Sequence, residues 1–432
     1  MGGGGVQRIL KFLKFWDYEQ FQVSVLTVKP SYFYAEDRSL AQDLPPHPQV
    51  FRSGSLDPFR LMFILRKICS PTRARTSVTN RESGGFIRRW ANSLFLPDSR
   101  ILWLPLAVLK IWKIHRWQPI DLLLASLPPF SSGLIAKIAG KLIAIPYLLD
   151  FRDSWTDNPY LPVPTRLHKK VQTFLEKNTI RRAAGCVFVN PALRDFYISK
   201  IPALKNIPST VIRNGYDPDD FQEIKREKES DAKNYFQIGV MGTVYSQGNA
   251  PLPLLEALTS LHQEKEESKQ KLRLVFIGKW AGEFLKKIKE HPYSHHISLI
   301  NYLPHHQALA YAKSLDALAL AVQSDLPGSA QVTPGRIYEY LYLQKPILAM
   351  CSPTGDLARL IRECQAGEVV DYYHVSELVD VLKKWLKDPA TMKANYTFQN
   401  LEQFHRRLLT AKLMNFIRLL LPTKVSQTNT VG

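Results

Sequence analysis

The sequence predicts an α/β protein made of two doubly wound domains, each with a parallel sheet covered by helices on both faces. Short apolar runs of strand length alternate strictly with helix-like segments in the second half of the chain, and more loosely in the first half. The chain has 432 residues, which suits two domains of roughly 200 residues each. Hydrophobic residues make up 45% of it, enough for two packed cores.

The second half carries the clearer pattern. Strands are predicted over 236–242, 272–278, 297–304, 316–322, 345–351 and 367–370. Helices are predicted between and after them, over 251–263, 281–291, 305–315, 333–344, 355–364 and 376–388. Strict alternation at these lengths is typical of βα units, so we expect a parallel sheet that is buried on both faces.

The first half alternates less regularly. Strands are predicted over 21–28, 120–126, 145–150, 185–190 and 209–214, and helices over 6–16, 131–141 and 166–183. Two such halves facing each other bring the carboxyl ends of both sheets to one cleft, where ligands bind. We expect an N-terminal domain over 1–214, a C-terminal domain over 215–400, a helix over 401–421 that packs back toward the N-terminal domain, and a disordered tail over 422–432.

The composition indicates which class of partner and which cellular compartment to expect. The net charge is +19 and the sequence pI about 9.6, which indicates an acidic partner such as nucleic acid, anionic lipid or a phosphorylated substrate. None of the four cysteines forms a CxxC pair, so a reducing cytoplasm is expected rather than a zinc site or a disulfide framework. We find neither a secretory signal nor an apolar run that approaches membrane-spanning length.

A glycine run precedes the first predicted helix. Residues 2–5 are all glycine, and such a run normally follows a strand, because it turns the chain tightly and brings backbone N–H groups close to a ligand. We therefore expect Gly4 and Gly5 to belong to the ligand site. We also expect that the first strand of the N-terminal domain is missing from the sequence as written and is encoded upstream. A flexible leader is the alternative.

The motif QVTPGRIYEYLYLQKPILA is the most specific one in the second half. Thr333 can cap a helix, Pro334 suits its first turn, and Gly335 lets a ligand approach the backbone. The free N–H groups and the helix dipole then make an anion site suited to a diphosphate. Arg336 adds a positive charge to this anion site. An ordinary capped helix with a surface arginine is the alternative.

Polar side chains also follow the strand predicted over 145–150. Asp150, Arg152 and Asp153 are expected to face the cleft, where they can bind a ligand. The alternative is that Arg152 pairs with a neighbouring carboxylate and fixes the loop.

Two further candidates lie near this strand end. Trp155 can stack on a ligand ring, or it can be an ordinary core residue. Ser126, at a neighbouring strand-to-helix loop, is a further candidate for the ligand site.

Five motifs in this order resemble the nucleotide-sugar glycosyltransferases of the GT-B fold, and among them retaining family 4. They are GGGGVQR, LLDFRDSWTDNPY, VFVN, VIRNGYDPDDF and TPGRIYEYLYLQKPILA. The resemblance covers nearly the whole chain. It implies that the C-terminal half holds the nucleotide diphosphate-sugar, that the N-terminal half holds most of the acceptor, and that no metal or other cofactor is required. It also implies transfer with retention, in which the leaving phosphate helps to deprotonate the acceptor.

The resemblance assigns donor contacts residue by residue. Glu339 stands where the family has the glutamate that binds the ribose hydroxyls, and Gln331 replaces a second glutamate that contacts the donor sugar. Gly242 and Thr243 end a strand where the family places donor-phosphate contacts. The family's arginine and lysine after this strand are absent, and Lys279 can supply the charge or is simply solvated.

Arg152, Asp153 and Arg336 are then the catalytic candidates, with Arg336 stabilising the departing nucleotide diphosphate. Ser126, Asp150 and Trp155 are the acceptor candidates, the tryptophan by stacking on a sugar ring. Asp150, Arg152 and Asp153 can bind acceptor hydroxyls or the donor phosphate.

Two stretches imitate metal sites. The segment DPDD at 217–220 looks like a metal-binding Asp-x-Asp, but it follows Asn-Gly and contains proline, so a turn is predicted. Five histidines between 291 and 306 lack the one-face i, i+4 spacing of a helical metal site, and a solvated loop is predicted. No metal ligands are therefore proposed.

The basic charge is concentrated between residues 51 and 120, where aromatic residues are interleaved with it. Basic and aromatic surface helices lie well on anionic lipid, so we expect docking at the inner face of the plasma membrane. No nucleic-acid motif appears, and a cationic face without a partner is the alternative.

These observations predict an enzyme that moves a sugar from a nucleotide diphosphate donor to a saccharide or lipid-linked acceptor, in cell-surface polysaccharide or glycolipid synthesis. A catalytically weak GT-B scaffold subunit and a GT-B nucleotide-sugar epimerase are the alternatives.

Overall fold

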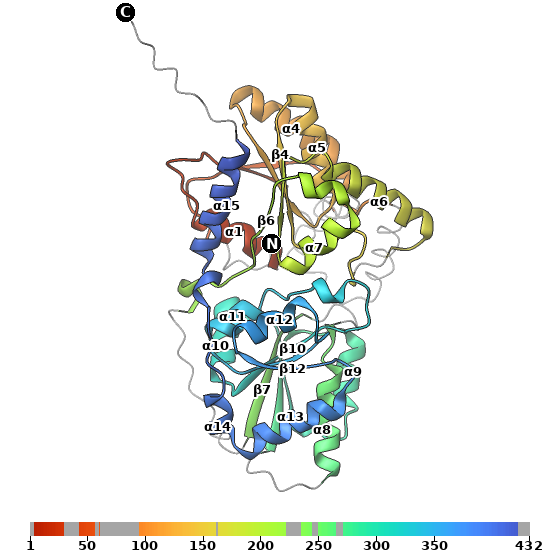
Figure 1. The fold of residues 1–432 in the computed structure, drawn as a ribbon, viewed down its shortest axis with the longest axis vertical. Coiled ribbons are helices and arrows are strands. Elements are labelled where there is room, and N and C mark those ends of the chain that lie inside the picture. Colours follow the sequence, from red (N-terminus) through yellow and green to blue (C-terminus); the bar gives the residue numbers. More distant parts are fainter. Residues whose placement is uncertain are drawn as a thin grey trace, which may run out of the picture.

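The computed structural model describes residues 4–29, 43–56, 60, 95–160, 163–221, 235–243, 249–264 and 271–421. The chain forms two α/β units that lie end to end along the longest axis of the molecule (Figure 1). All the strand pairs described are parallel, as the alternation of strands and helices predicts.

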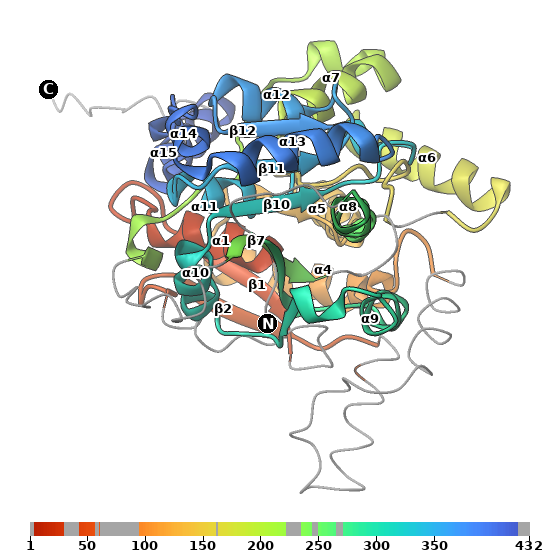
Figure 2. The same cartoon turned by 90° about the horizontal axis from the view of Figure 1, so that it is seen from below.

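The C-terminal unit is built on one sheet of six strands in the order β12-β11-β10-β7-β8-β9. The strands are β7 Tyr235–Thr243, β8 Lys271–Lys279, β9 Ile297–Ile300, β10 Ala317–Ala321, β11 Ile347–Met350 and β12 Gly367–Val370. Its helices are α8 Leu252–Gln263, α9 Gly282–Lys289, α10 His305–Ser314, α11 Ile337–Tyr342, α12 Asp356–Glu363, α13 Val375–Lys387 and α14 Pro389–Ala394. Figure 2 views this unit from below, where α8 and α13 lie together.

Alternation of side chains along each strand gives the C-terminal sheet a core on both faces. On β8, Leu274 and Phe276 pack toward α8, α9 and α13, whereas Val275 and Ile277 pack toward α10, α11 and α12. This two-sided burial explains why the strands are almost entirely apolar in the sequence.

The N-terminal unit contains two separate sheets among its described residues. Four strands, in the order β3-β4-β5-β6, are β3 Leu123–Leu127, β4 Tyr147–Phe151, β5 Gly185–Phe188 and β6 Ser209–Val211. A pair is formed by β1 Ser24–Val28 and β2 Gln49–Ser53. The main helices are α1 Gly4–Lys14, α4 Leu104–Trp117, α5 Ser131–Ile143, α6 Arg166–Ile180 and α7 Pro191–Lys200. The absent first strand stays a prediction.

The last helix, α15 Arg406–Leu420, lies beside α1 on the N-terminal unit (Figure 1). Four of its residues pack against α1 and the four-stranded sheet: Leu409, Leu413, Phe416 and Ile417. It begins later than position 401 because 402–404 form a 3-10 turn and His405 is extended.

Sequence patterns missed several elements. β2, α4, α7 and α14 were not predicted, although α7 has a clear start signal, with Asn190 as N-cap and proline after it. Within the ranges that the structure describes, no helix is long and apolar enough to cross a membrane.

Candidate active site

The loops at the carboxyl ends of the two sheets are in direct contact. Asn190, after β5, donates from Nδ2 to the Gln331 carbonyl oxygen at 2.7 Å and to Thr333 Oγ1 at 3.3 Å. Arg213, after β6, pairs with Asp356 at 2.7 Å. Loops of both units, among them the one that carries the predicted residue Gln331, therefore meet at one junction.

Arg336 lies on the end of β7 because Gly242 leaves room for it. A Cβ atom on Gly242, whose φ is +124°, would come within 2.0 Å of Arg336 Nη1. The neighbouring Gly278, with φ +137°, is opposite Gly242 in the sheet, and a Cβ there would lie 1.8 Å from the Gly242 carbonyl oxygen. The structure thus joins the predicted residues Gly242 and Arg336, and it adds Gly278.

The segment before Arg336 differs from the expected helix start. α11 begins at Ile337, and Arg336 occupies the N-cap position without a side-chain cap bond. Thr333 does not cap the helix, because its hydroxyl donates to Asp356 Oδ2 at 2.6 Å. Pro334 accepts a backbone bond from Ile337, and Gly335 is exposed next to Asn214.

Gln331 lies at the junction with a free hydrogen-bond acceptor atom on its side chain, among the residues that the structure describes. Its Oε1 atom is buried and has no hydrogen-bond partner among the described residues. The preceding turn at Gly328, with φ +84°, packs so closely on the N-terminal unit that a Cβ would lie 2.1 Å from the Asp157 carbonyl oxygen. A buried amide oxygen without a partner is unfavourable, so a ligand hydroxyl would stabilise it.

The glycine run lies against Arg152. A Cβ on Gly5 would be 1.6 Å from Arg152 Nη1, and Gly4 is the first residue of α1. The guanidinium donates to the carbonyl oxygens of Leu127, at 3.2 Å, and Pro128. Burial raises the pKa of the neighbouring Asp153, while the charge of Arg152 opposes that shift. Gly5, Arg152 and Asp153 therefore form one group.

Asp150 and Ser126 belong to a buried network. Asp150 is 1% exposed and receives two bonds from Arg8, at 2.7 Å and 3.1 Å. The hydroxyl of Ser126 donates to the same carboxylate at 2.9 Å. Arg8 also donates to the Ile212 and Arg213 carbonyl oxygens. In this structure both predicted acceptor residues stabilise the fold, and Arg8, which the sequence analysis missed, is the partner of Asp150.

Trp155 lies in the core. It is 1% exposed and stacks on Phe130 with ring centroids 5.1 Å apart. This position favours the packing alternative, because the ring is not open to a sugar.

Comparison with known proteins shows the family of this chain. Residues 3–215 match the family described as "Glycosyl transferase 4-like domain", and residues 221–400 match "Glycosyl transferases group 1". The chain belongs to the GT-B glycosyltransferases of the family 4-like kind. Sugar transfer is its chemistry, and no curated protein matches the sequence.

Solved structures share the fold of this glycosyltransferase. Sucrose-phosphate synthase from Thermosynechococcus elongatus is 12% identical with a TM-score of 0.66, over 97% of this chain and 94% of that one. HepE from Anabaena, in complex with UDP-glucose, is 14% identical with a TM-score of 0.64 over 97% of each chain. The lipopolysaccharide outer core galactosyltransferase WaaB is 13% identical with a TM-score of 0.57, over 97% and 96%.

Glu339 of this glycosyltransferase is held by a histidine. His305 Nε2 lies 2.9 Å from Glu339 Oε1. Burial opposes protonation of His305, but the charges of Glu339 and Asp220 outweigh it and raise its pKa to about 9. His305 is the first residue of α10, so the histidine was wrongly placed in a loop, and its role went unnoticed because its partner is distant in sequence.

Two lysines of α1 neutralise the acidic turn at the joint. Lys11 contacts Asp217 at 2.7 Å and Asp220 at 2.5 Å, and Lys14 contacts Asp217 at 2.7 Å and Asp219 at 2.8 Å. These carboxylates fix α1 to the joint between the units.

Two predicted donor residues, Thr243 and Lys279, and the buried Arg406 complete the description of the site. Thr243 pairs with Lys279 in the β7–β8 register, and the Lys279 ammonium lies 5.5 Å from the Tyr302 ring centroid. The side chain of Thr243 lies outside the described residues. Arg406 is buried, and its Nη1 atom has no hydrogen-bond partner in the described ranges. The charge of Arg8 and burial lower its pKa to about 10, with burial the larger cause.

Proposed function

We propose that this glycosyltransferase moves a sugar from a nucleotide diphosphate donor to a saccharide or lipid-linked acceptor, with retention and without a metal. The observation that carries the proposal is the Arg336 guanidinium seated on Gly242 at the carboxyl end of β7. A fixed cation at a strand end, beside backbone that glycine leaves open, stabilises a departing diphosphate. The fold relative HepE binds UDP-glucose, which supports a nucleotide-sugar donor.

The other donor-site residues contact different parts of the nucleotide sugar. Glu339 accepts hydrogen bonds from the ribose hydroxyls, and the unpartnered Gln331 Oε1 accepts one from the donor sugar. Lys279 adds positive charge beside Thr243. Arg336 and Lys279 supply the positive charge that a metal provides in other transferases, so the reaction proceeds without one.

Acceptor chemistry is assigned to the N-terminal unit, at Arg152 and Asp153. Arg152 lies against Gly5 at the start of α1, and burial lowers its pKa while Asp153 opposes the shift. A charged pair at a strand's carboxyl end can orient an acceptor hydroxyl toward the donor sugar.

An anionic membrane surface is the proposed site of action. On α4, Trp112 is 38% exposed and Trp117 70% exposed, next to Lys110, Lys113 and Arg116. This combination suits docking at the inner face of the plasma membrane, in cell-surface polysaccharide or glycolipid synthesis. Most of the basic stretch named in the sequence analysis, including 61–94, lies outside the described residues.

The decisive experiment is a thermal-shift screen over nucleotide sugars, followed by nucleotide release with and without candidate acceptors. We expect one nucleotide sugar to raise the melting temperature and an acceptor to stimulate release. Binding without release would favour a scaffold subunit, and acceptor-independent conversion of the sugar would favour an epimerase. No shift with any nucleotide sugar contradicts the proposal.

The first mutational test is Glu339→Ala. Losing a charge-assisted bond to the ribose should weaken nucleotide binding by about 1.5–3 kcal/mol in calorimetry. Glu363→Ala, on the exposed end of α12, is the matched control and should bind normally. Equal affinity of the two variants would remove Glu339 from the donor site.

A further inference from the structure

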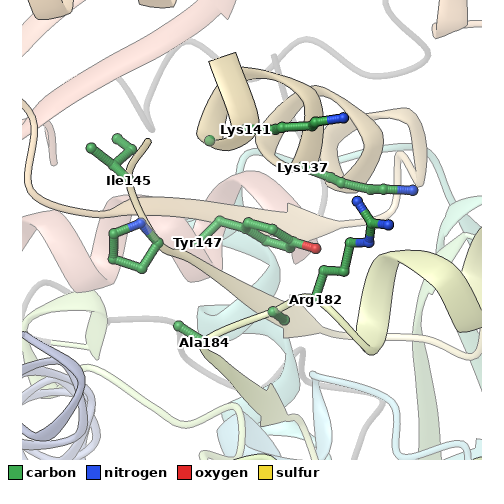
Figure 3. A pocket seen from close by; sticks show the side chains of 9 residues that line it. Lys137, Lys141, Ile145, Tyr147, Arg182 and Ala184 are labelled. Carbon is green, nitrogen blue, oxygen red and sulfur yellow. The ribbon is translucent and has the colours of Figure 1, made fainter. Parts of the chain in front are cut away.

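A basic pocket lies on the N-terminal unit, away from the donor junction. It has a volume of about 300 Å³ and is lined by Lys137 and Lys141 of α5, Arg182 after α6, and Tyr147 at the start of β4. Figure 3 shows the ends of Lys137 and Arg182 directed toward each other beside the Tyr147 ring. Because β4 begins at Tyr147, the pocket lies at the amino end of the sheet, opposite the catalytic candidates.

The three cations of this pocket have no counter-charge in the structure. None of them makes an ion pair or hydrogen bond with another residue in the described ranges. Burial lowers the pKa of Lys137, and the charges of Arg182 and Lys141 lower it further. Such mutual repulsion is relieved when an anion binds between the cations.

The sequence on either side of the lining residues also lacks acidic side chains. Neither 122–149 nor 177–194, the two segments that contribute the lining, contains an aspartate or a glutamate. The Tyr147 hydroxyl is already committed, because it donates to the Thr179 carbonyl oxygen at 2.6 Å. Its ring forms the apolar wall of the pocket, and the cations provide the only charge among the lining residues.

We propose that this pocket binds a phosphate group, as a second ligand site independent of the donor site. An ammonium and a guanidinium facing each other suit the oxygens of a phosphate, which accept several charge-assisted hydrogen bonds at once. The volume exceeds that of a bare phosphate, so the group can carry a substituent. A phospholipid headgroup and a soluble phosphorylated compound share this chemistry.

The first arm of the test measures binding of inorganic phosphate to the full chain by calorimetry at constant ionic strength. The double variant Lys137→Gln/Arg182→Gln should bind about tenfold more weakly or worse, since two charge-assisted contacts are lost. The matched control, Lys287→Gln/Lys387→Gln, removes two exposed lysines of the C-terminal unit and should bind as the wild type does. A charge-preserving Lys137→Arg/Arg182→Lys variant should retain binding.

The second arm identifies the source of the phosphate. Flotation compares vesicles containing phosphatidic acid with vesicles containing phosphatidylglycerol at the same mole fraction. If the pocket variant loses only its preference for phosphatidic acid, the source is a lipid headgroup. If vesicle binding is unchanged while inorganic phosphate binding is lost, the source is soluble. Unchanged binding in both arms overturns the proposal, and neither readout depends on sugar transfer.

Discussion

At the residue scale, Gly242 decides whether Arg336 reaches the end of β7. Gly242→Ala should weaken nucleotide binding about tenfold or more, because the methyl group would take the place of the guanidinium. The positive φ of +124° adds about 1–3 kcal/mol of backbone strain for alanine. Gly282→Ala is the control, since a Cβ there meets no atom within 4 Å. Calorimetry that finds equal affinities for the two variants would refute this role of Gly242.

The second residue-scale prediction concerns pH. Charged groups around His305 are Glu339 on α11, Asp220 in the joint and Lys11 on α1. Burial and the charge of Lys11 lower the pKa of His305, but Glu339 and Asp220 outweigh them and raise it from 6.5 to about 9. The protonated pair therefore stabilises the fold fully below pH 6.5, and this contribution is lost as pH rises through about 9.

Urea unfolding between pH 6 and pH 10 tests the direction of this change in stability with pH. The wild type should be more stable than His305→Gln by about 1–3 kcal/mol at pH 6, and the difference should shrink toward pH 10. His306→Gln, on the exposed neighbour, should show no such trend. A difference that stays constant with pH would exclude a protonated His305.

At the scale of elements, α1 is fixed to the N-terminal sheet by a buried ion pair. Arg8 is 0% exposed and binds Asp150 on β4. Arg8→Met should destabilise the protein by about 3–5 kcal/mol, because Asp150 would remain buried without its partner. Arg8→Met with Asp150→Leu should recover most of this loss. Arg194→Met, which affects only an exposed pair with Asp195, is the control in urea unfolding. A loss no larger than that of the control would show that the pair contributes little.

At the scale of the whole molecule, the two units are joined by a buried charge. Asp356 is 0% exposed and is held by Arg213 and Thr333. Arg213→Met should leave it poorly compensated, so we expect scanning calorimetry to show the units unfolding in two separated transitions. Arg359→Met, on the exposed side of the same helix, should leave the profile unchanged. One transition at the wild-type temperature would show that other contacts couple the units.

The sequence by itself determined the alternation of strands and helices, the parallel sheets and the place of Gly242 and Lys279 at strand ends. These features follow from local patterns, since burial on both faces makes a strand apolar and glycine marks a turn or close approach. Only the tertiary structure decided the partners of the charged residues. Arg8 is 142 positions from Asp150, and His305 is 34 from Glu339. Residue spacing does not encode such pairs, because folding brings together side chains that have no fixed separation along the chain.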